Sequence, residues 1–245
     1  MIDVHNHLIP NIDDGSDSLS LSRKLLEDAI DEGITDVCIT PHFMKHGPFK
    51  VRKKELCTLF EQFKKDTEDL NVNLYLGNEL YIDRELDELL AADEICSMNG
   101  TDYVLIEFPF EQYRREYDEY LYNVSLNYKI IIAHPERYSY VKEDHDFVDR
   151  WLKEGYILQS NSTSLNSKES KKVIFDFIEK GKLSIIASDA HNKYRPLSLK
   201  DAYDLISKKF SKETADLLME TNPRRIIENK DVYRIPKIKK RFFWN

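Results

Sequence analysis

Histidines and acidic residues follow short apolar runs at many points along this chain. The first sixteen residues, MIDVHNHLIPNIDDGS, place His5 and His7 two residues apart and continue to Asp13 and Asp14. Imidazole and carboxylate groups are the ligands with which proteins hold Zn, Mn or Fe. An HxH pair alone is a weak motif, and Asp-Asp-Gly is also typical of a turn. The metal interpretation therefore depends on whether the rest of the chain supplies further ligands.

Similar side chains stand at or just after the ends of five later apolar runs. They are His42 in ITPHF, Glu79 in YLGNEL, Glu107 in VLIEF, His134 in IIIAHPER, and Asp189 and His191 in IIASDAH. A lone histidine at a strand end is more often structural, but five of the seven histidines share this placement. With Asp14 included, nine candidates are available, and a tetrahedral ion takes about four. The sequence therefore predicts a centre of two or three divalent ions.

Two arginines follow candidate ligands closely and point to an anionic substrate. Arg137 lies in HPER and Arg195 lies in HNKYRP. A guanidinium group binds phosphate oxygens in a bidentate manner, and paired metal ions activate water against phosphoryl groups. As an alternative, either arginine could pair with a carboxylate of the site. Together they favour phosphoester hydrolysis. His46 is expected on a loop beside the site, and His145, within KEDHD, on the surface.

The elements that must position these residues alternate along the chain. Strands are predicted at 2–5, 36–40, 72–77, 103–107, 129–134, 156–160 and 183–188. Helices are predicted at 18–32, 51–70, 83–91, 116–127, 144–154, 167–180, 197–219 and 223–229. This alternation predicts βαβ units and a parallel sheet, either closed as a barrel or open and doubly wound. In a barrel the carboxyl ends of all strands share one face, so the candidate ligands would converge there.

Composition and missing motifs exclude several other classes. The net charge is −8, from 44 acidic and 36 basic residues, which argues against a nucleic-acid-binding protein. The three cysteines, Cys38, Cys57 and Cys96, form no CxxC pair and begin no Cx5R loop, which argues against a thiolate phosphatase. Neither GxGxxG nor a P-loop is present. Without a signal peptide or an apolar run of membrane-spanning length, the cytoplasm is the expected compartment.

The combined motifs resemble the PHP (polymerase and histidinol phosphatase) superfamily. More narrowly, DVHNHLIPNIDDGS, AHPERY and IASDAHN are similar to CpsB/YwqE-type tyrosine-protein phosphatases of Gram-positive capsule and exopolysaccharide operons. The resemblance runs from Ile2 to about Asn229. It implies an α/β protein with a distorted (β/α)7 TIM-like barrel, the PHP fold. We expect this single metallophosphatase barrel over 1–235, followed by a tail at 236–245.

The resemblance also implies the roles of individual residues. The ligands would form three groups, namely His5, His7, Glu79 and Asp189; Glu79, Glu107 and His134; and Asp14, His42 and His191. Manganese is the expected metal, with iron, zinc or cobalt as alternatives. Arg137 and Arg195 would bind the phosphate, the match of Arg195 being looser, and His42 or Asp14 could assist proton transfer. We expect direct attack of a metal-bound hydroxide on phosphorus, without a phosphoenzyme.

The substrate implied by the resemblance is a phosphotyrosine cluster on the tail of a membrane-associated bacterial tyrosine kinase that governs polysaccharide export. Two alternatives stay open: a small-molecule phosphatase of the histidinol-phosphate kind, and a non-catalytic metal-binding module that docks on the kinase. The tail PKIKKRFFWN joins basic and aromatic residues, which is typical of peripheral contact with the inner face of a membrane. A tail that folds back to close the barrel, or a disordered one, is the alternative. The sequence leaves the oligomeric state open.

Overall fold

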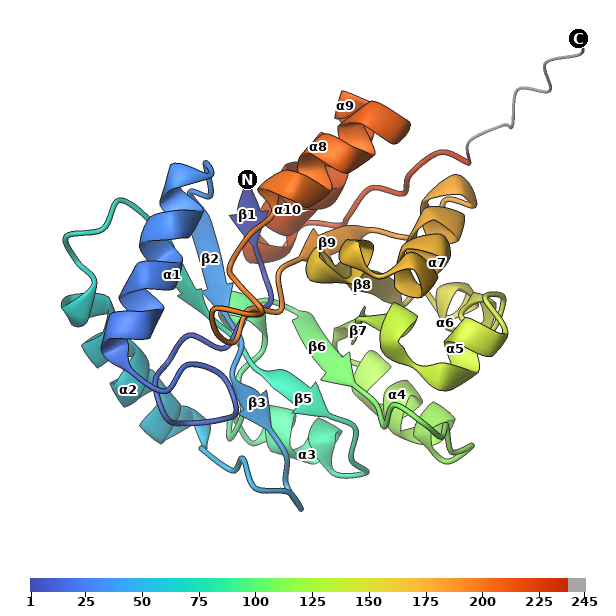
Figure 1. Cartoon of the computed structure of the whole chain (residues 1–245). Coiled ribbons are helices and arrows are strands. Elements are labelled where there is room, and N and C mark those ends of the chain that lie inside the picture. The colour runs from blue at the N-terminus through green and yellow to red at the C-terminus, as the bar shows by residue number, and fades with distance from the viewer. Residues whose placement is uncertain (238–245) are drawn as a thin grey trace, which may run out of the picture.

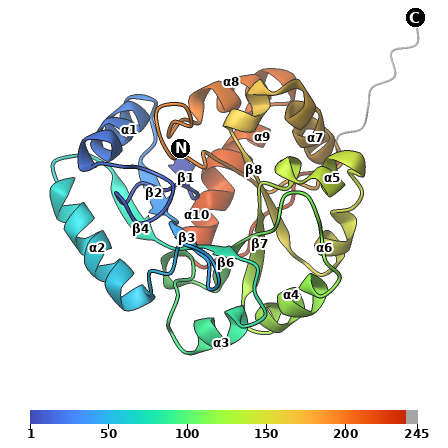
Figure 2. The same ribbon diagram turned by 60° about the horizontal axis from the view of Figure 1, so that its bottom comes forward.

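Parallel strands form the centre of the computed structural model, which describes residues 1–237 (Figures 1 and 2). A first sheet has the order β1-β2-β4 and a second has the order β3-β5-β6-β7-β8-β9. The strands are β1 (Ile2–Asp3), β2 (Asp36–Ile39), β3 (His42–Phe43), β4 (Asn73–Leu76), β5 (Glu79–Tyr81), β6 (Tyr103–Glu107), β7 (Lys129–Ala133), β8 (Ile157–Asn161) and β9 (Ile185–Ala187).

Backbone hydrogen bonds join these two sheets into a closed ring. The N–H of Asp189 donates to the carbonyl of His5 at 2.8 Å, and the N–H of His7 donates to the carbonyl of Ala190 at 2.8 Å. The chain after β9 therefore pairs with the chain after β1. On the other side, β2 continues into β3 and β4 into β5. The predicted α/β barrel with parallel strands is confirmed.

Two of the seven predicted strands are each followed in the structure by a second short strand. The predicted strand 36–40 corresponds to β2, and Pro41, which has no N–H to donate to a sheet, separates it from β3. The predicted strand 72–77 ends before Gly77, where a Cβ atom would lie 2.9 Å from Sδ of Met98. The sequence prediction missed β3 and β5, and these two short strands begin with candidate ligands.

The helices of the described residues lie around the outside of the barrel, except for the last, which lies at its centre in Figure 2. They are α1 (Leu19–Asp31), α2 (Lys53–Asp66), α3 (Leu86–Ala91), α4 (Tyr117–Ser125), α5 (Ser139–Glu143), α6 (Asp149–Lys153), α7 (Lys168–Glu179), α8 (Lys200–Lys209), α9 (Lys212–Asp216) and α10 (Asn222–Ile227). Ser18 caps α1 through its side chain, which accepts from the N–H of Leu21. The predicted helix 144–154 is shorter than expected, and the predicted helix 197–219 is divided into α8, α9 and a π-helical turn, Leu217–Thr221.

Strand residues alternate between two apolar clusters. Leu105 and Ile131 belong to a cluster inside the barrel, whereas their neighbours Val104 and Ile130 face the outer helices. Ile226 of α10 joins the inner cluster, so α10 lies across the amino ends of the strands. This arrangement leaves the carboxyl ends of the strands for polar side chains.

Arg224 of α10 fastens this helix to the barrel. Its guanidinium donates to both carboxylate oxygens of Asp36 in β2, at 2.9 and 2.8 Å. Within residues 1–237, no helix is long and apolar enough to cross a membrane. The predicted membrane contact of the 236–245 tail falls mainly on residues 238–245, which lie outside the described residues.

Candidate metal centre

All nine predicted ligands gather at the carboxyl end of the barrel. His5 and His7 follow β1, His42 begins β3, Glu79 begins β5, Glu107 ends β6, His134 follows β7, and Asp189 and His191 follow β9. Asp14 comes from the loop between β1 and α1. Eight of these side chains are buried, and only that of Asp14 is substantially exposed. The strand ends thus bring together residues up to 186 positions apart in the chain, from His5 to His191.

Two of these residues have an unusual backbone conformation. His134 has a φ of 31° and Asp189 has a φ of 54°, both in the left-handed region that non-glycine residues rarely adopt. Such a conformation costs on the order of 1–3 kcal/mol and persists where the surrounding structure enforces it. Both residues lie just beyond a barrel strand, where the chain must turn sharply. The strain is therefore located at the centre itself.

Four side chains form a group whose spacing matches tetrahedral coordination. Nε2 of His5 and Nε2 of His7 lie 3.4 Å apart. Oε2 of Glu79 lies 3.2 and 3.3 Å from these two nitrogens, and Oδ1 of Asp189 lies 3.5 Å from each. Metal–ligand bonds of 2.0–2.1 Å place neighbouring tetrahedral ligands about 3.4 Å apart. The distances from His5 and His7 to each other, to Glu79 and to Asp189 therefore fit a shared divalent ion.

A second group surrounds the other oxygen of Glu79. Nε2 of His134 lies 3.0 Å from Oε1 of Glu79 and 3.5 Å from Oε1 of Glu107. Burial, together with the negative charge of Glu79, holds the pKa of Glu107 well above its ordinary range. Two carboxylates in such proximity need a cation beside them if both are to be ionised. The arrangement therefore fits a second ion that shares Glu79 with the first.

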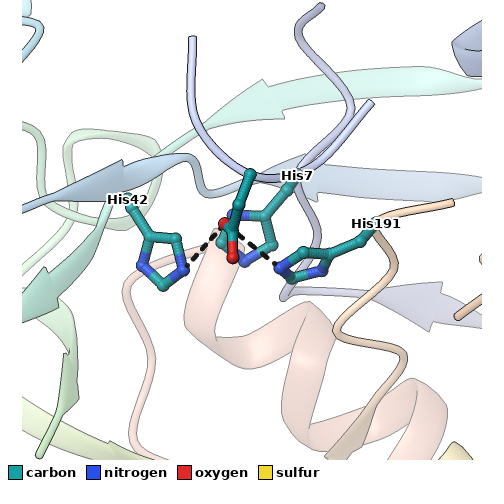
Figure 3. Close-up of side chains that lie close together, drawn as sticks. His7, His42 and His191 are labelled. Carbon is teal, nitrogen blue, oxygen red and sulfur yellow. Dashed lines mark ion pairs between the residues drawn. The ribbon is translucent and has the colours of Figure 1, made fainter. Parts of the chain in front are cut away.

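The third group contains Asp14, His42, His191 and His7 (Figure 3). Oδ1 of Asp14 lies 3.4 Å from Nε2 of His42 and 3.5 Å from Nε2 of His191. Nδ1 of His42 is buried, lies 3.1 Å from Oε2 of Glu79, and has no hydrogen-bond partner within the described part of the chain. A buried nitrogen without a partner is costly in a protein that binds nothing there. His42 thus faces the first group with one nitrogen and the third with the other.

Residues that the sequence did not single out hold several of these ligands in place. Nδ1 of His5 lies 2.8 Å from Oε1 of Gln159, which orients the ring so that Nε2 faces the other candidate ligands. Asn161 donates from its amide to Oδ2 of Asp189 at 2.6 Å, and Gln159 donates to Asn161 at 2.9 Å. Both are alternate residues of β8 and point to one face. That alternation was a signal that the sequence analysis did not use.

The two arginines lie at the rim of the centre and share one partner. Nη1 of Arg137 donates to Oδ2 of Asp189 at 3.0 Å, and Nη2 of Arg195 donates to the same oxygen. The side chain of each arginine is 33% exposed, so part of each guanidinium faces solvent. The structure therefore contains the pairing with a site carboxylate that was considered as the alternative to phosphate binding. That pairing engages only one of several N–H donors on each group.

A cavity of about 130 Å³ opens over the ligands. Its lining consists of Asp14, His42, Met44, Phe49, Glu79, Glu107, Phe110, Arg137, Asp189, His191 and Arg195. His46 lies on the loop beside this cavity, as expected, and its exposed ring is 3.6 Å from Asp83. His145 is remote from the centre and its Nδ1 is 3.3 Å from Asp176.

Proteins of similar sequence match nearly the whole length of this chain. The family described as "Capsular polysaccharide synthesis, CpsB/CapC" matches residues 1–228. The tyrosine-protein phosphatase YwqE of Bacillus subtilis is 31% identical over 243 residues, which cover 96% of this chain and 95% of the relative. The tyrosine-protein phosphatase CpsB of Streptococcus pneumoniae is 31% identical over 239 residues, which cover 93% of this chain and 98% of the relative.

Solved structures agree with this assignment. One chain from the crystal structures of YwqE and CpsB, described as unique metal-dependent tyrosine phosphatases, matches with a TM-score of 0.91 and 30% identity. The match covers 98% of this chain and 100% of that chain. A phosphotriesterase homology protein from Escherichia coli shares only the fold, with a TM-score of 0.62 and 11% identity over 91% of this chain and 97% of that chain. The resemblance noted in the sequence is confirmed, and the chain belongs to the CpsB/CapC family.

Proposed function

We propose that this chain is a metal-dependent protein-tyrosine phosphatase. It hydrolyses phosphotyrosine on the tail of a membrane-associated bacterial tyrosine kinase that regulates capsular or exopolysaccharide synthesis. The observation that carries the proposal is the group formed by His5, His7, Glu79 and Asp189, in which the two histidines lie 3.2–3.5 Å from each other and from both carboxylates, distances that fit a shared divalent ion. The YwqE and CpsB relatives, which are tyrosine-protein phosphatases, supply the substrate class.

The ligand groups would hold two or three divalent ions, of which manganese is the expected one. Bound there, such ions would activate a water molecule and neutralise charge on the phosphoryl oxygens. Glu79 would bridge ions because its two oxygens face different groups. Gln159 and Asp13 keep the histidine rings oriented, so the centre is preorganised before substrate arrives.

Arg137 and Arg195 bind the substrate phosphoryl group in this proposal. Each guanidinium is fixed by Asp189 and keeps further N–H donors for phosphate oxygens at the mouth of the cavity. Charge that develops on these oxygens during transfer is stabilised by donors already in place. The leaving phenolate has a pKa near ~10, so the reaction requires little or no proton donation from the protein.

The test is a phosphatase assay of metal-stripped protein that is reconstituted ion by ion. A tyrosine-phosphorylated kinase tail and histidinol phosphate serve as the competing substrates. We expect turnover of the tail and negligible turnover of histidinol phosphate. The reverse preference would identify a small-molecule phosphatase of the same superfamily. Turnover that survives in both His5→Ala and Asp189→Ala would contradict the proposed centre, and absence of turnover with every ion would indicate a docking module.

A further inference from the structure

A short loop follows β3 (Figure 1), and two of its side chains, Met44 and Phe49, line the cavity over the candidate ligands. Its sequence is MKHGPF, residues 44–49. The N–H of Met44 donates to the carbonyl of Phe49 at 2.6 Å, and the N–H of Gly47 donates to the carbonyl of Met44 at 3.0 Å. A Cβ atom at Gly47 would lie 2.6 Å from Cβ of Met44. The loop is thus closed on itself and requires glycine at its tip.

Two ion pairs fasten this 44–49 loop to the segment between β5 and α3. Lys45 pairs with Glu85, and Nε2 of His46 lies 3.6 Å from Oδ2 of Asp83. None of these four side chains lines the cavity over the ligands. Their contacts hold the loop in position without taking part in the centre. The loop is therefore a tethered element whose inward side chains are Met44 and Phe49.

Packing in the hydrophobic core does not account for the position of the Phe49 side chain. Its ring stacks on His42, with centroids 5.5 Å apart and an interplanar angle of 11°. Phe49 and Met44 line the cavity, yet neither belongs to the two apolar clusters that form the core of the described residues. The other cavity residues are mostly charged groups or histidines. Two half-exposed apolar side chains facing such a cavity are suited to contact an apolar part of a ligand.

We propose that Met44 and Phe49 form an apolar wall that receives the aromatic ring of the substrate phosphotyrosine. The inference rests on the proposed function. With the phosphoryl group at Arg137 and Arg195, the ring that carries it lies within or beside the same cavity, which Met44 and Phe49 also line. Phenylalanine contacts a phenyl ring in offset-stacked or edge-to-face geometry, and the thioether of methionine contacts ring edges. The 44–49 loop therefore selects aryl over alkyl phosphates.

The test compares Phe49→Ala with the unmodified protein, both fully loaded with metal. The substrate is a short peptide with one phosphotyrosine, and inorganic phosphate is the competing inhibitor. We expect KM for the peptide to rise about tenfold, while the inhibition constant of phosphate and the bound metal content stay unchanged. Phe49→Leu, which keeps an apolar side chain, should give an intermediate KM. Tyr122→Ala, at an exposed aromatic residue of α4, is the matched control and should behave as the unmodified protein.

Other outcomes would overturn the inference. An unchanged KM in Phe49→Ala would show that the ring of the substrate does not contact this side chain. A parallel weakening of phosphate inhibition or a loss of metal would show that Phe49 only supports His42. Failure of the proposed function is recognised separately in the unmodified protein, as turnover of histidinol phosphate without turnover of the phosphotyrosine peptide.

Discussion

Oδ2 of Asp13 lies 2.7 Å from Nδ1 of His7 in the interior of the metal centre. The same oxygen accepts the backbone N–H of His42 at 3.0 Å, and Oδ1 of Asp13 accepts the N–H of Gly15 at 3.0 Å. Burial alone would raise the pKa of Asp13, but the His7 ring and these N–H donors hold it below its ordinary value. One buried carboxylate therefore fixes two candidate ligands that come from different strands.

This contact predicts different consequences for the two neighbouring aspartates. Asp14→Ala removes a proposed ligand, whereas Asp13→Ala removes the partner that orients His7. We expect the larger loss of activity in Asp14→Ala, and a loss of metal affinity of about 10–100-fold in Asp13→Ala. Metal titration together with steady-state kinetics measures both. Identical behaviour of the two variants would show that their roles have been assigned wrongly.

Glu79→Gln tests the shared position of this residue. Oxygens of Glu79 lie 3.0–3.3 Å from nitrogens of His5, His7, His42 and His134. Loss of its charge should remove at least one bound ion and lower kcat by roughly 100-fold or more. Elemental analysis and a phosphatase assay provide the two measurements. Glu61→Gln, on the exposed face of α2, is the control. Full metal content in Glu79→Gln would argue against a bridging role.

Chelation should abolish the phosphatase activity, whereas thiol alkylation should leave it unchanged. Cys38 and Cys96 are buried, and burial raises the pKa of the Cys96 thiol to about 12. Such thiols are poor nucleophiles at neutral pH. We expect a chelator to abolish activity, manganese to restore it, and iodoacetamide to leave it unchanged. An activity that resists chelators and is lost on alkylation would refute the metal mechanism.

The arginines at the rim should affect substrate binding more than metal binding. Arg137→Met and Arg195→Met each remove a proposed phosphate ligand, and we expect about a 10–100-fold rise in KM and in the inhibition constant of phosphate. Lys193→Met is the matched control, because it removes a positive charge from the loop that carries Arg195. Unchanged phosphate inhibition in both arginine variants would limit their role to pairing with Asp189.

The ion pair between Asp36 and Arg224 predicts that the free energy of unfolding decreases as the pH is lowered into the acid range. Burial would raise the pKa of Asp36, but hydrogen bonds from Arg224 and its neighbours hold it below its ordinary value. A depressed native pKa stabilises the fold above the unfolded pKa of about 3.9, and this contribution is lost as pH falls through the native pKa. Urea unfolding between pH 7 and pH 2 measures the effect.

Asp36→Asn should therefore be less stable at neutral pH and depend less on pH in the acid range. The expected loss is roughly 1–2 kcal/mol, since the partly exposed Arg224 is screened by solvent. Asp69→Asn provides the control, because the ion pair of Asp69 with Arg23 lies on the surface and should contribute little. Parallel pH profiles of the unmodified protein and Asp36→Asn would contradict this assignment.

Strand-end placement was sufficient to predict which side chains come together. In a parallel barrel the end of each strand reaches the same face, so position in the sequence translates directly into position in space. The contact of Asp13 with His7 could not be predicted in this way. The Asp-Asp-Gly pattern indicates a turn, which the bond to Gly15 bears out, but spacing does not encode which way the other carboxylate oxygen points.

The contacts of the two arginines could not be predicted from the sequence either. Arg137 and Arg195 could be placed near the centre, but their common contact with one oxygen of Asp189 depends on side-chain conformations. The two short strands that the prediction missed, β3 and β5, have a similar explanation. Pro41 and Gly77 are visible in the sequence, yet whether such residues end a strand or only interrupt it depends on the neighbouring strands.

Helix α10 at the amino end of the barrel has a consequence for the divergence of this family. The inner apolar cluster and Arg224 support the barrel at its amino end, remote from the loops that surround the cavity. Amino-acid substitutions in a loop such as 44–49 can therefore change which ligands the cavity binds without destabilising the barrel. The sequences of homologues should differ most in these loops. Substitutions that changed the substrate during evolution should lie there and not in the strands or helices of the barrel.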